Sequence, residues 1–359
     1  MKRWLVLPFL LLSTNAVIAA PLHYTGEVTL WQDTVWSEEV LVDGILTVAP
    51  DVTLEIRPGT VVRFTPFDSN GDGIGEHELF VQGLLLALGS AAQPILFTST
   101  KAEAGPGSWG ALNLMADAAE SRLEHCTVEY AYRGFHAHFS RALLRDAIFR
   151  HNTRGLQFQE SQVTLERCQV VDNLNGLQFR DSEVHIKDST VARNYWGLRG
   201  VVSHGSISGC RFEENLVNGV NLRDAQFTIS GCRISGNRKG LYLQASVGEI
   251  RGNTIVGNSE HGILLEKSEV TLCDNHVAGN GRAGLKNIDA RGELRNNTFL
   301  DNGEYAVVND GANPLDARGN WWGTVDAARI ARLVRDGSDR AGLGLVDTGT
   351  FLRVAPPVP

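Results

Sequence analysis

One stretch of the chain, from Asp68 to Glu78, has the residue types and spacing of a calcium-binding loop. It opens with carboxylate and amide oxygens at alternate positions, and glycine stands where such a loop turns sharply. The twelfth position, where a bidentate glutamate is expected, is Leu79. The alternative is an acidic, flexible turn without an ion. We expect a structural calcium ion whose ligands come from Asp68, Asn70, Asp72, Ile74, Glu76 and Glu78.

A second set of residues carries polar, cationic and aromatic side chains that can bind a sugar chain. Hydrogen bonds and ring stacking are the interactions that such a ligand needs. An ordinary solvated surface is the alternative explanation for any one of them. The candidate glycan-binding residues are His136, Arg180, Tyr195, Trp196, Arg199, Arg223 and Tyr242. Whether they line up depends on the repeat that positions them.

That repeat is 21 or 22 residues long. A glycine followed by an apolar residue recurs from Gly134-Phe135 to Gly284-Leu285, and Ala306-Val307 continues the series. Between these marks apolar and polar residues alternate with period two, which predicts three short strands in each repeat. A leucine-rich repeat has a similar period, but it needs a helical or irregular return that this pattern lacks. We expect an all-β fold, a right-handed single-stranded parallel β-helix with rungs of 21–22 residues.

Identical residue types recur in rows, as stacking of equivalent positions at strand spacing predicts. An Asn row, running from Asn152 to Asn302, can hydrogen-bond from rung to rung, or it can supply the left-handed conformation of a sharp corner. Cys126, Cys168, Cys210 and Cys232 share a third row and are expected to be small buried hydrophobic residues. Cys210 and Cys232 fall on adjacent rungs, so a disulfide between them is conceivable.

The two ends of the chain depart from the repeat. Residues 1–19 read as a signal peptide, with Lys2 and Arg3 before an apolar segment and cleavage expected after Ala19. The β-helix is expected over 20–323, with N-terminal rungs at 20–100 and regular rungs at 108–323. A cap and tail follow at 324–359, with a short helix. Trp321 and Trp322 suit closure of the coil, or they form a stacking platform for sugar.

Charge and hydropathy restrict the partners. The chain has 33 Lys and Arg against 41 Asp and Glu, and loss of Lys2 and Arg3 with the signal leaves a net charge of −10. This excludes nucleic acid and anionic membrane surfaces as main partners. No stretch after the signal has the roughly 18 apolar residues of a membrane span. A secreted, periplasmic or cell-surface location is expected.

The repeat, the N-terminal pattern around Pro58-Gly59-Thr60, the segment from Pro94 to Ser99, and the closure from Gly319 to Gly323 resemble bacterial right-handed parallel β-helix repeat proteins of the pectin-lyase-like superfamily. The resemblance covers nearly all of the chain after the signal. It implies the fold, but the superfamily holds lyases, hydrolases, epimerases and non-catalytic surface proteins. The Asp-Asp pair, Gly-His-Gly and Arg-x-Lys motifs of its hydrolases are absent from this sequence, as are the expected lyase and epimerase signatures.

Two hypotheses for function follow. The first is a non-catalytic extracytoplasmic β-helix that binds carbohydrate, such as a cell-surface glycan, or has a structural role at the cell surface. The alternative is a polysaccharide lyase, glycoside hydrolase or epimerase that acts on one face of the coil, along the row from His136 to Tyr242. The sequence favours the first hypothesis because no acid–base set converges in it.

Overall fold

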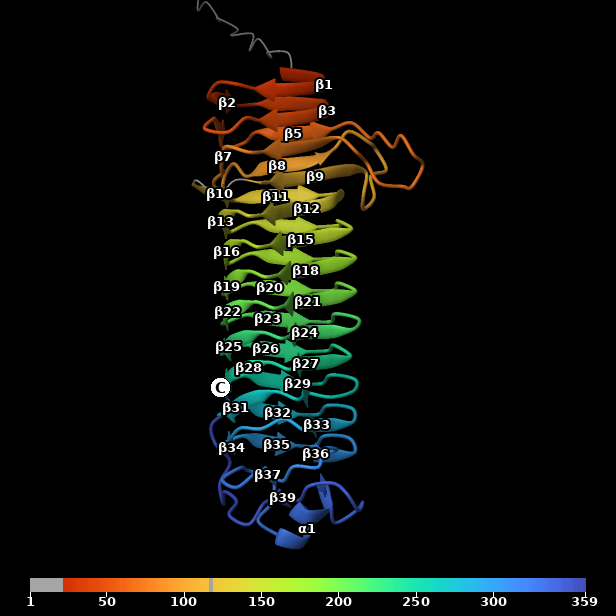
Figure 1. Ribbon diagram of the computed structural model, residues 1–359, viewed down its shortest axis with the longest axis vertical. Helices are drawn as coiled ribbons and strands as arrows, with labels where there is room; N and C mark the ends of the chain where they lie inside the picture. Colours follow the sequence, from red (N-terminus) through yellow and green to blue (C-terminus); the bar gives the residue numbers. More distant parts are fainter. Residues whose placement is uncertain (1–21, 116–118) are drawn as a thin grey trace, which may run out of the picture.

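The computed structural model describes residues 22–115 and 119–359, so the predicted signal peptide lies outside the described residues. The chain winds into a right-handed parallel β-helix of about 14 turns, stacked along one axis (Figure 1). Each regular turn contributes three strands that pair in parallel with the equivalent strands of the next turn. The predicted fold and rung length are confirmed.

The first face of the coil is a separate parallel sheet. Its outward side chains alternate with buried ones along each strand, as a sheet with one solvated face requires. Its strands are β2 (Thr34–Trp36), β4 (Thr53–Ile56), β7 (Leu84–Leu88), β10 (Glu120–Glu124), β13 (Arg141–Arg145), β16 (Gln162–Glu166), β19 (Glu183–Lys187), β22 (His204–Ser208), β25 (Gln226–Ser230), β28 (Val247–Arg251), β31 (Glu269–Cys273) and β34 (Leu294–Arg295).

The second face holds the short strands that follow each strand of the first face. The long strands β1 (Leu22–Leu30) and β3 (Glu39–Val48) begin this face and continue into the third. The other strands of the second face are β5 (Val61–Phe64), β8 (Ile95–Ser99), β11 (Cys126–Glu129), β14 (Ile148–Arg150), β17 (Gln169–Val171), β20 (Thr190–Ala192), β23 (Arg211–Glu213), β26 (Arg233–Ser235), β29 (Thr254–Val256), β32 (His276–Ala278) and β35 (Thr298–Leu300).

The third face completes each turn and carries the candidate glycan-binding residues. Its strands are β6 (Glu78–Val81), β9 (Trp109–Leu114), β12 (Ala131–His138), β15 (Arg154–Gln159), β18 (Asn175–Arg180), β21 (Trp196–Val201), β24 (Asn218–Arg223), β27 (Lys239–Gln244), β30 (Ile263–Glu266), β33 (Ala283–Ile288) and β36 (Tyr305–Asn309). Two long loops, 65–77 and 100–108, project beside the first strands of this face (Figure 1).

The Asn row forms a continuous hydrogen-bonded stack inside one corner. Asn194 Oδ1 accepts from the backbone N–H and the side-chain amide of Asn173, and Asn194 Nδ2 donates to the carbonyl of Val170 and to Asn215 Oδ1. The positive φ angles of this corner belong to the preceding residues, such as Arg193 at 54°. The rung-to-rung hydrogen bonds are therefore confirmed, and the left-handed asparagine is wrong.

The glycine row follows from the same corner. A Cβ on Gly176 would lie 2.5 Å from the carbonyl oxygen of Gly197 and 3.0 Å from the amide of Asn194. A side chain there would push adjacent rungs apart, which explains why glycine holds this position from Gly134 to Gly284.

The cysteine row lies at another corner, and its members are buried as expected. All five cysteines are free. Burial raises the pKa of the Cys168 thiol to about 12, so it stays protonated.

The C-terminal cap contains the one short α-helix of the described residues, α1 (Ala327–Arg332), whose N-cap is Asp326. Trp322 is buried and stacks on Phe299 with ring centroids 5.5 Å apart, so it closes the core. The strand β38 (Val334–Arg335) pairs with β36, and β37 (Leu315–Asp316) pairs with β39 (Val346–Asp347). These elements cover apolar interior that the last rung would otherwise expose to water.

Candidate functional site

The predicted polar row lies on the third face in the expected register. His136, Gln157, Gln178, Arg199, Asn221 and Tyr242 are successive Cα partners from β12 to β27. The neighbouring outward row contains His138, Gln159, Arg180, Val201 and Arg223. These side chains alternate with a buried apolar row, so the coil presents them in lines parallel to its axis.

Arg180, Arg199 and Arg223 come together around one hollow of about 200 Å³ on this face. Val201 and Phe179 lie among them. The other predicted glycan-binding residues lie apart from this hollow. Tyr195 is an exposed corner residue whose ring meets that of Trp196 at 6.1 Å, edge to face. Tyr242 lies further along the coil and donates its hydroxyl to Glu266 at 2.8 Å.

A different set of polar groups converges on His136, at the N-terminal end of the third face. Nδ1 of His136 lies 2.9 Å from Oδ1 of Asn113, and Asn113 also hydrogen-bonds to Glu78. Because an amide oxygen only accepts, His136 carries its proton on Nδ1, and the lone pair is on Nε2. Asn113 therefore fixes both the orientation and the tautomer of this imidazole.

Two arginines give this set a positive charge. Arg133 and Arg154 both lie over the ring of Tyr132, with guanidinium carbons 5.1 Å and 5.2 Å from its centroid. Arg154 donates to Gln157 at 2.8 Å. Nε of Arg133 is buried and has no hydrogen-bond partner among the described residues. Leaving a buried donor of this kind unpaired costs free energy.

Burial and charge shift the protonation of the two central groups. Desolvation, with further repulsion from Arg133, His138 and Arg154, lowers the pKa of His136 to about 4. Desolvation raises the pKa of Glu78, although Arg133 and Asn113 oppose it. His136 is thus a neutral imidazole near pH 7, able to accept a proton. We name Glu78, Asn113, Arg133, His136 and Arg154 the His136 cluster.

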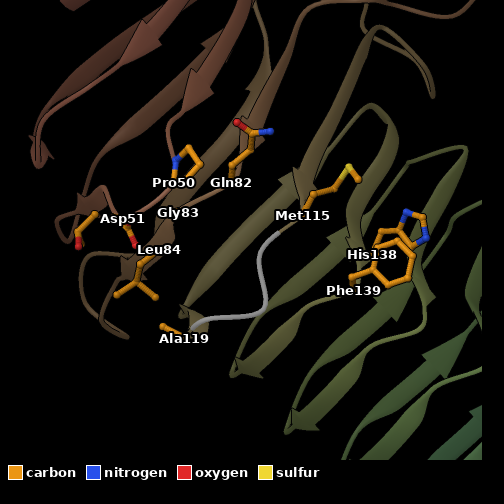
Figure 2. A pocket seen from close by; sticks show the side chains of 10 residues that line it. Pro50, Asp51, Gln82, Gly83, Leu84, Met115, Ala119, His138 and Phe139 are labelled. Carbon is orange, nitrogen blue, oxygen red and sulfur yellow. The ribbon is translucent and has the colours of Figure 1, made fainter.

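A pocket of about 470 Å³ adjoins the His136 cluster through His138. The rings of His138 and Phe139 are stacked with centroids 4.0 Å apart, and the rings of His136 and His138 are 6.2 Å apart. Figure 2 shows Met115, His138 and Phe139 on one side, with Pro50, Gln82 and Leu84 opposite. The pocket thus combines apolar and aromatic surface with a few polar groups, as ligand sites usually do.

The predicted calcium loop is held by its own hydrogen bonds. The Asp68 carboxylate accepts from the backbone N–H groups of Gly71 and Gly73, Asp72 accepts from Ile74, and Glu76 accepts from Ser69. The backbone bonds lower the pKa of Asp68. Glu78 lies in β6 and faces Asn113 and Arg133. Within the described ranges, no three His, Cys, Asp or Glu side chains cluster as a metal site would require.

The sequence identified His136 but not the residues around it. The sequence pattern places Glu78 in the calcium loop, and it gives no signal for Asn113, Arg133 or Arg154. The reason is rung length: Leu46 pairs with Leu79 and Leu79 with Leu112, so these early rungs are 33 residues long rather than 21 or 22. A neutral histidine that is fixed by an amide and lies beside two cations has the chemical character of a general base.

Comparison with known proteins supports the fold. The model of the family described as right handed beta helix region matches residues 199–321. Together with the parallel pairing described above, this match supports a right-handed parallel β-helix. Among the described residues, no helix has the length and hydropathy needed to cross a lipid bilayer.

Several solved structures are similar to this chain. A double mutant of the periplasmic alginate epimerase AlgG is 11% identical with a TM-score of 0.46, and the match covers 75% of this chain and 76% of that one. Pectate lyase Pel9A is 16% identical, with a TM-score of 0.39 and coverage of 84% and 82%. The A-module of the Azotobacter vinelandii mannuronan C-5 epimerase AlgE4 is 13% identical, with a TM-score of 0.36 and coverage of 77% and 86%. No curated protein matches the sequence.

Proposed function

We propose that this protein is an extracytoplasmic enzyme that binds an acidic polysaccharide along its third face and removes a proton from it at the His136 cluster. The outcome is either β-elimination, as in a lyase, or return of the proton to the opposite side, as in an epimerase. The observation that carries the proposal is His136 itself: its imidazole is neutral, oriented by Asn113, and flanked by Arg133 and Arg154.

The chemistry requires a base and a way to hold negative charge. The hydrogen on the carbon next to the sugar carboxylate leaves as a proton, and the electrons of the broken C–H bond pass toward the carboxylate. The guanidinium groups of Arg133 and Arg154 would stabilise this charge, and Nε2 of His136 would take the proton. In elimination the electrons then form a carbon–carbon double bond as the glycosidic oxygen leaves, and this oxygen takes a proton from the His136 imidazolium or from water. In epimerisation a water molecule protonates the carbon from its other face, and the His136 imidazolium releases its proton to solvent.

Substrate binding would also adjust the basicity of His136. In the free protein two of the groups that depress its pKa are Arg133 and Arg154. A carboxylate bound to these cations cancels part of their repulsion and so raises the affinity of His136 for a proton. Glu78 is a positioning residue in this scheme, because it acts on His136 through Asn113.

The test is a screen of polyuronates, sulfated glycans and neutral glycans against the protein. Ultraviolet absorbance detects unsaturated chain ends, and proton NMR detects inverted sugars. We expect one of these products from a polyuronate, and none from the His136→Gln variant. The matched control is His185→Gln, a histidine on the first face. Absence of both products from every polyuronate that binds would overturn the proposal.

A non-catalytic glycan-binding role is the second candidate, because the three arginines that line the hollow, Arg180, Arg199 and Arg223, lie two to four rungs from His136. Binding of a polysaccharide without any product would favour it.

We further propose that the loop from Asp68 to Glu76 binds calcium in a structural role. Its carboxylate and amide groups already sit in a tight turn, with Asn70 donating to Asp72 at 3.2 Å. An ion would replace hydrogen bonds of this turn with oxygen ligation and tie the projecting loop together.

A further inference from the structure

The hollow on the third face has arginine side chains at its sides and an apolar floor. In the outward row that contains Arg180 and Arg223, the residue between them is Val201, a short side chain that is only 8% exposed. Arg199 lies two residues before Val201 on the same strand and faces the same side. The long arginine side chains thus form walls around an apolar floor.

The floor is firmly packed. A Cβ on Gly200 would lie 2.2 Å from the Phe179 ring and 2.8 Å from Leu222, so the ring fills the space that a side chain at 200 would take. Phe179 and Phe158 lie beneath the hollow and are almost fully buried. The hollow is therefore a fixed shape in the coil surface, because close-packed interiors resist deformation.

The charges around the hollow are not balanced. Arg180 contacts its neighbour Asp181 at 3.2 Å, and Arg223 contacts Asp224 at 3.5 Å. Both are exposed pairs, which contribute little and exchange partners easily. In the part of the chain that the structure describes, Arg199 has no acidic partner within ion-pair distance. Three guanidinium groups therefore surround one hollow beside two carboxylates.

We propose that this hollow, the arginine cradle, is a remote subsite that binds an anionic group of the same glycan chain that reaches His136. The inference rests on the proposed function and extends it, because it sets the charge and the minimum length of the substrate. Guanidinium groups suit carboxylates and sulfate esters, since their planar donors pair with two oxygens at once.

The register fixes the distance between the two places. His136 and Arg199 occupy the same outward row three rungs apart. At strand spacing of about 4.8 Å this corresponds to roughly 14 Å along the axis. An extended chain of linked pyranose rings advances by about one rung per sugar. A substrate must then contain at least four sugars to contact both His136 and Arg199. Gln157 and Gln178 lie between these two residues, also line the hollow, and offer neutral hydrogen bonds.

The experiment compares the affinity of oligosaccharides by calorimetry, without relying on turnover. The probes are the dimer and hexamer of a uronic acid, a sulfated neutral hexamer, and an unmodified neutral hexamer. In the intact protein we expect the uronate hexamer to bind at least ten-fold more tightly than the dimer. In Arg199→Gln, and in the double variant Arg180→Gln/Arg223→Gln, this hexamer-to-dimer ratio should fall about ten-fold.

The matched control is Arg251→Gln, an exposed arginine of the first face that pairs with Glu249; its ratio should equal that of the intact protein. Tighter binding of the sulfated hexamer would identify sulfate esters as the anionic group, and tighter binding of the uronate hexamer would identify carboxylates. An unchanged ratio in the Arg199 variant, or equal binding of the neutral hexamer, would overturn the cradle. If the ratio falls as expected but no polyuronate is converted, the cradle stands and the catalytic proposal fails.

Discussion

The regular rungs and the N-terminal end of the third face are built from the same coil but use their outward residues differently. In the regular rungs, charged corner residues are paired across rungs, as Arg193 is with Asp172 at 2.8 Å and Arg238 with Glu260 at 2.8 Å. At the N-terminal end, Arg133 has an unsatisfied buried donor, and His136 and Glu78 have shifted pKa values. Repetition accounts for the first region, and convergence of unlike residues marks the second.

The difference arises from rung length. Rungs of 21 or 22 residues place equivalent positions of the repeat on top of one another. The side chains that come together are therefore of similar type. The 33-residue rungs place Glu78 and Asn113 beside the start of the regular coil, where they meet His136. An insertion between strands is thus the feature that assembles a site with different functional groups on a uniform scaffold.

The largest effect on turnover should come from replacing the proposed catalytic base, His136. His136→Gln keeps a polar side chain of similar reach but cannot take a proton, so the turnover of a polyuronate should fall at least a hundred-fold, as loss of general base catalysis typically gives. Initial rates at saturating polymer measure this, with His185→Gln as the control on the first face. A His136→Gln variant that retains the turnover of the intact protein would place the chemistry elsewhere.

In the regular rungs the largest effect should fall on stability. Asn194→Ala removes two bonds accepted from Asn173 and leaves buried backbone groups unpaired, so it should destabilise the fold by about 3 kcal/mol. Urea unfolding measures the change. Asn221 is an outward asparagine on the next rung, and Asn221→Ala should change stability by less than about 0.5 kcal/mol. Equal effects from the two variants would contradict the buried asparagine stack.

The pH dependence of stability tests the contribution of His136. The folded-state pKa of His136 lies at about 4, below the ordinary 6.5, so the folded protein binds this proton less well than the unfolded chain does. Its contribution to stability is present above pH 6.5 and is lost as the pH falls toward 4, by about 3 kcal/mol. When both are unfolded by urea across this window, His136→Gln should lose about 3 kcal/mol less stability than the intact protein, because His261, whose pKa is also lowered to about 4, acts in both.

The same pKa predicts the acid limb of activity. The rate constant kcat/KM reports groups of the free enzyme, so it should stay constant down to pH 5 and fall as the pH passes through about 4. An acid limb near 6.5 would show that His136 is not depressed, or that another group titrates.

The smallest effect should come from the projecting loop. Calcium should raise the melting temperature by about 2 °C, and the rise should vanish in Asp68→Ala/Asp72→Ala. Magnesium serves as the control ion, because it demands a tighter octahedral site. The loop lies beside the His136 cluster but makes separate contacts, so the hundred-fold effect of His136→Gln should be the same with and without calcium.

The sequence was sufficient to predict the coil because each rung repeats the same physical solution. Val170, Leu177 and Phe179 are buried as alternation requires, and His136 and Arg199 fall in one outward row. The site was harder, because Glu78 and Asn113 lie in rungs whose length the repeat does not set. The tautomer of His136 and the unpaired donor of Arg133 depend on side-chain contacts across those rungs, which no period in the sequence encodes.

Exchange of carbon-bound hydrogen with solvent tests directly whether His136 removes a proton from the sugar. A polyuronate that binds the protein is incubated in heavy water, and deuterium at the carbon next to the carboxylate is followed by proton NMR, together with unsaturated ends. We predict that the intact protein and His185→Gln produce deuterated or unsaturated sugars, and that His136→Gln produces neither. If the intact protein binds the polymer but the sugars gain neither deuterium nor unsaturated ends, the protein does not remove a proton at His136.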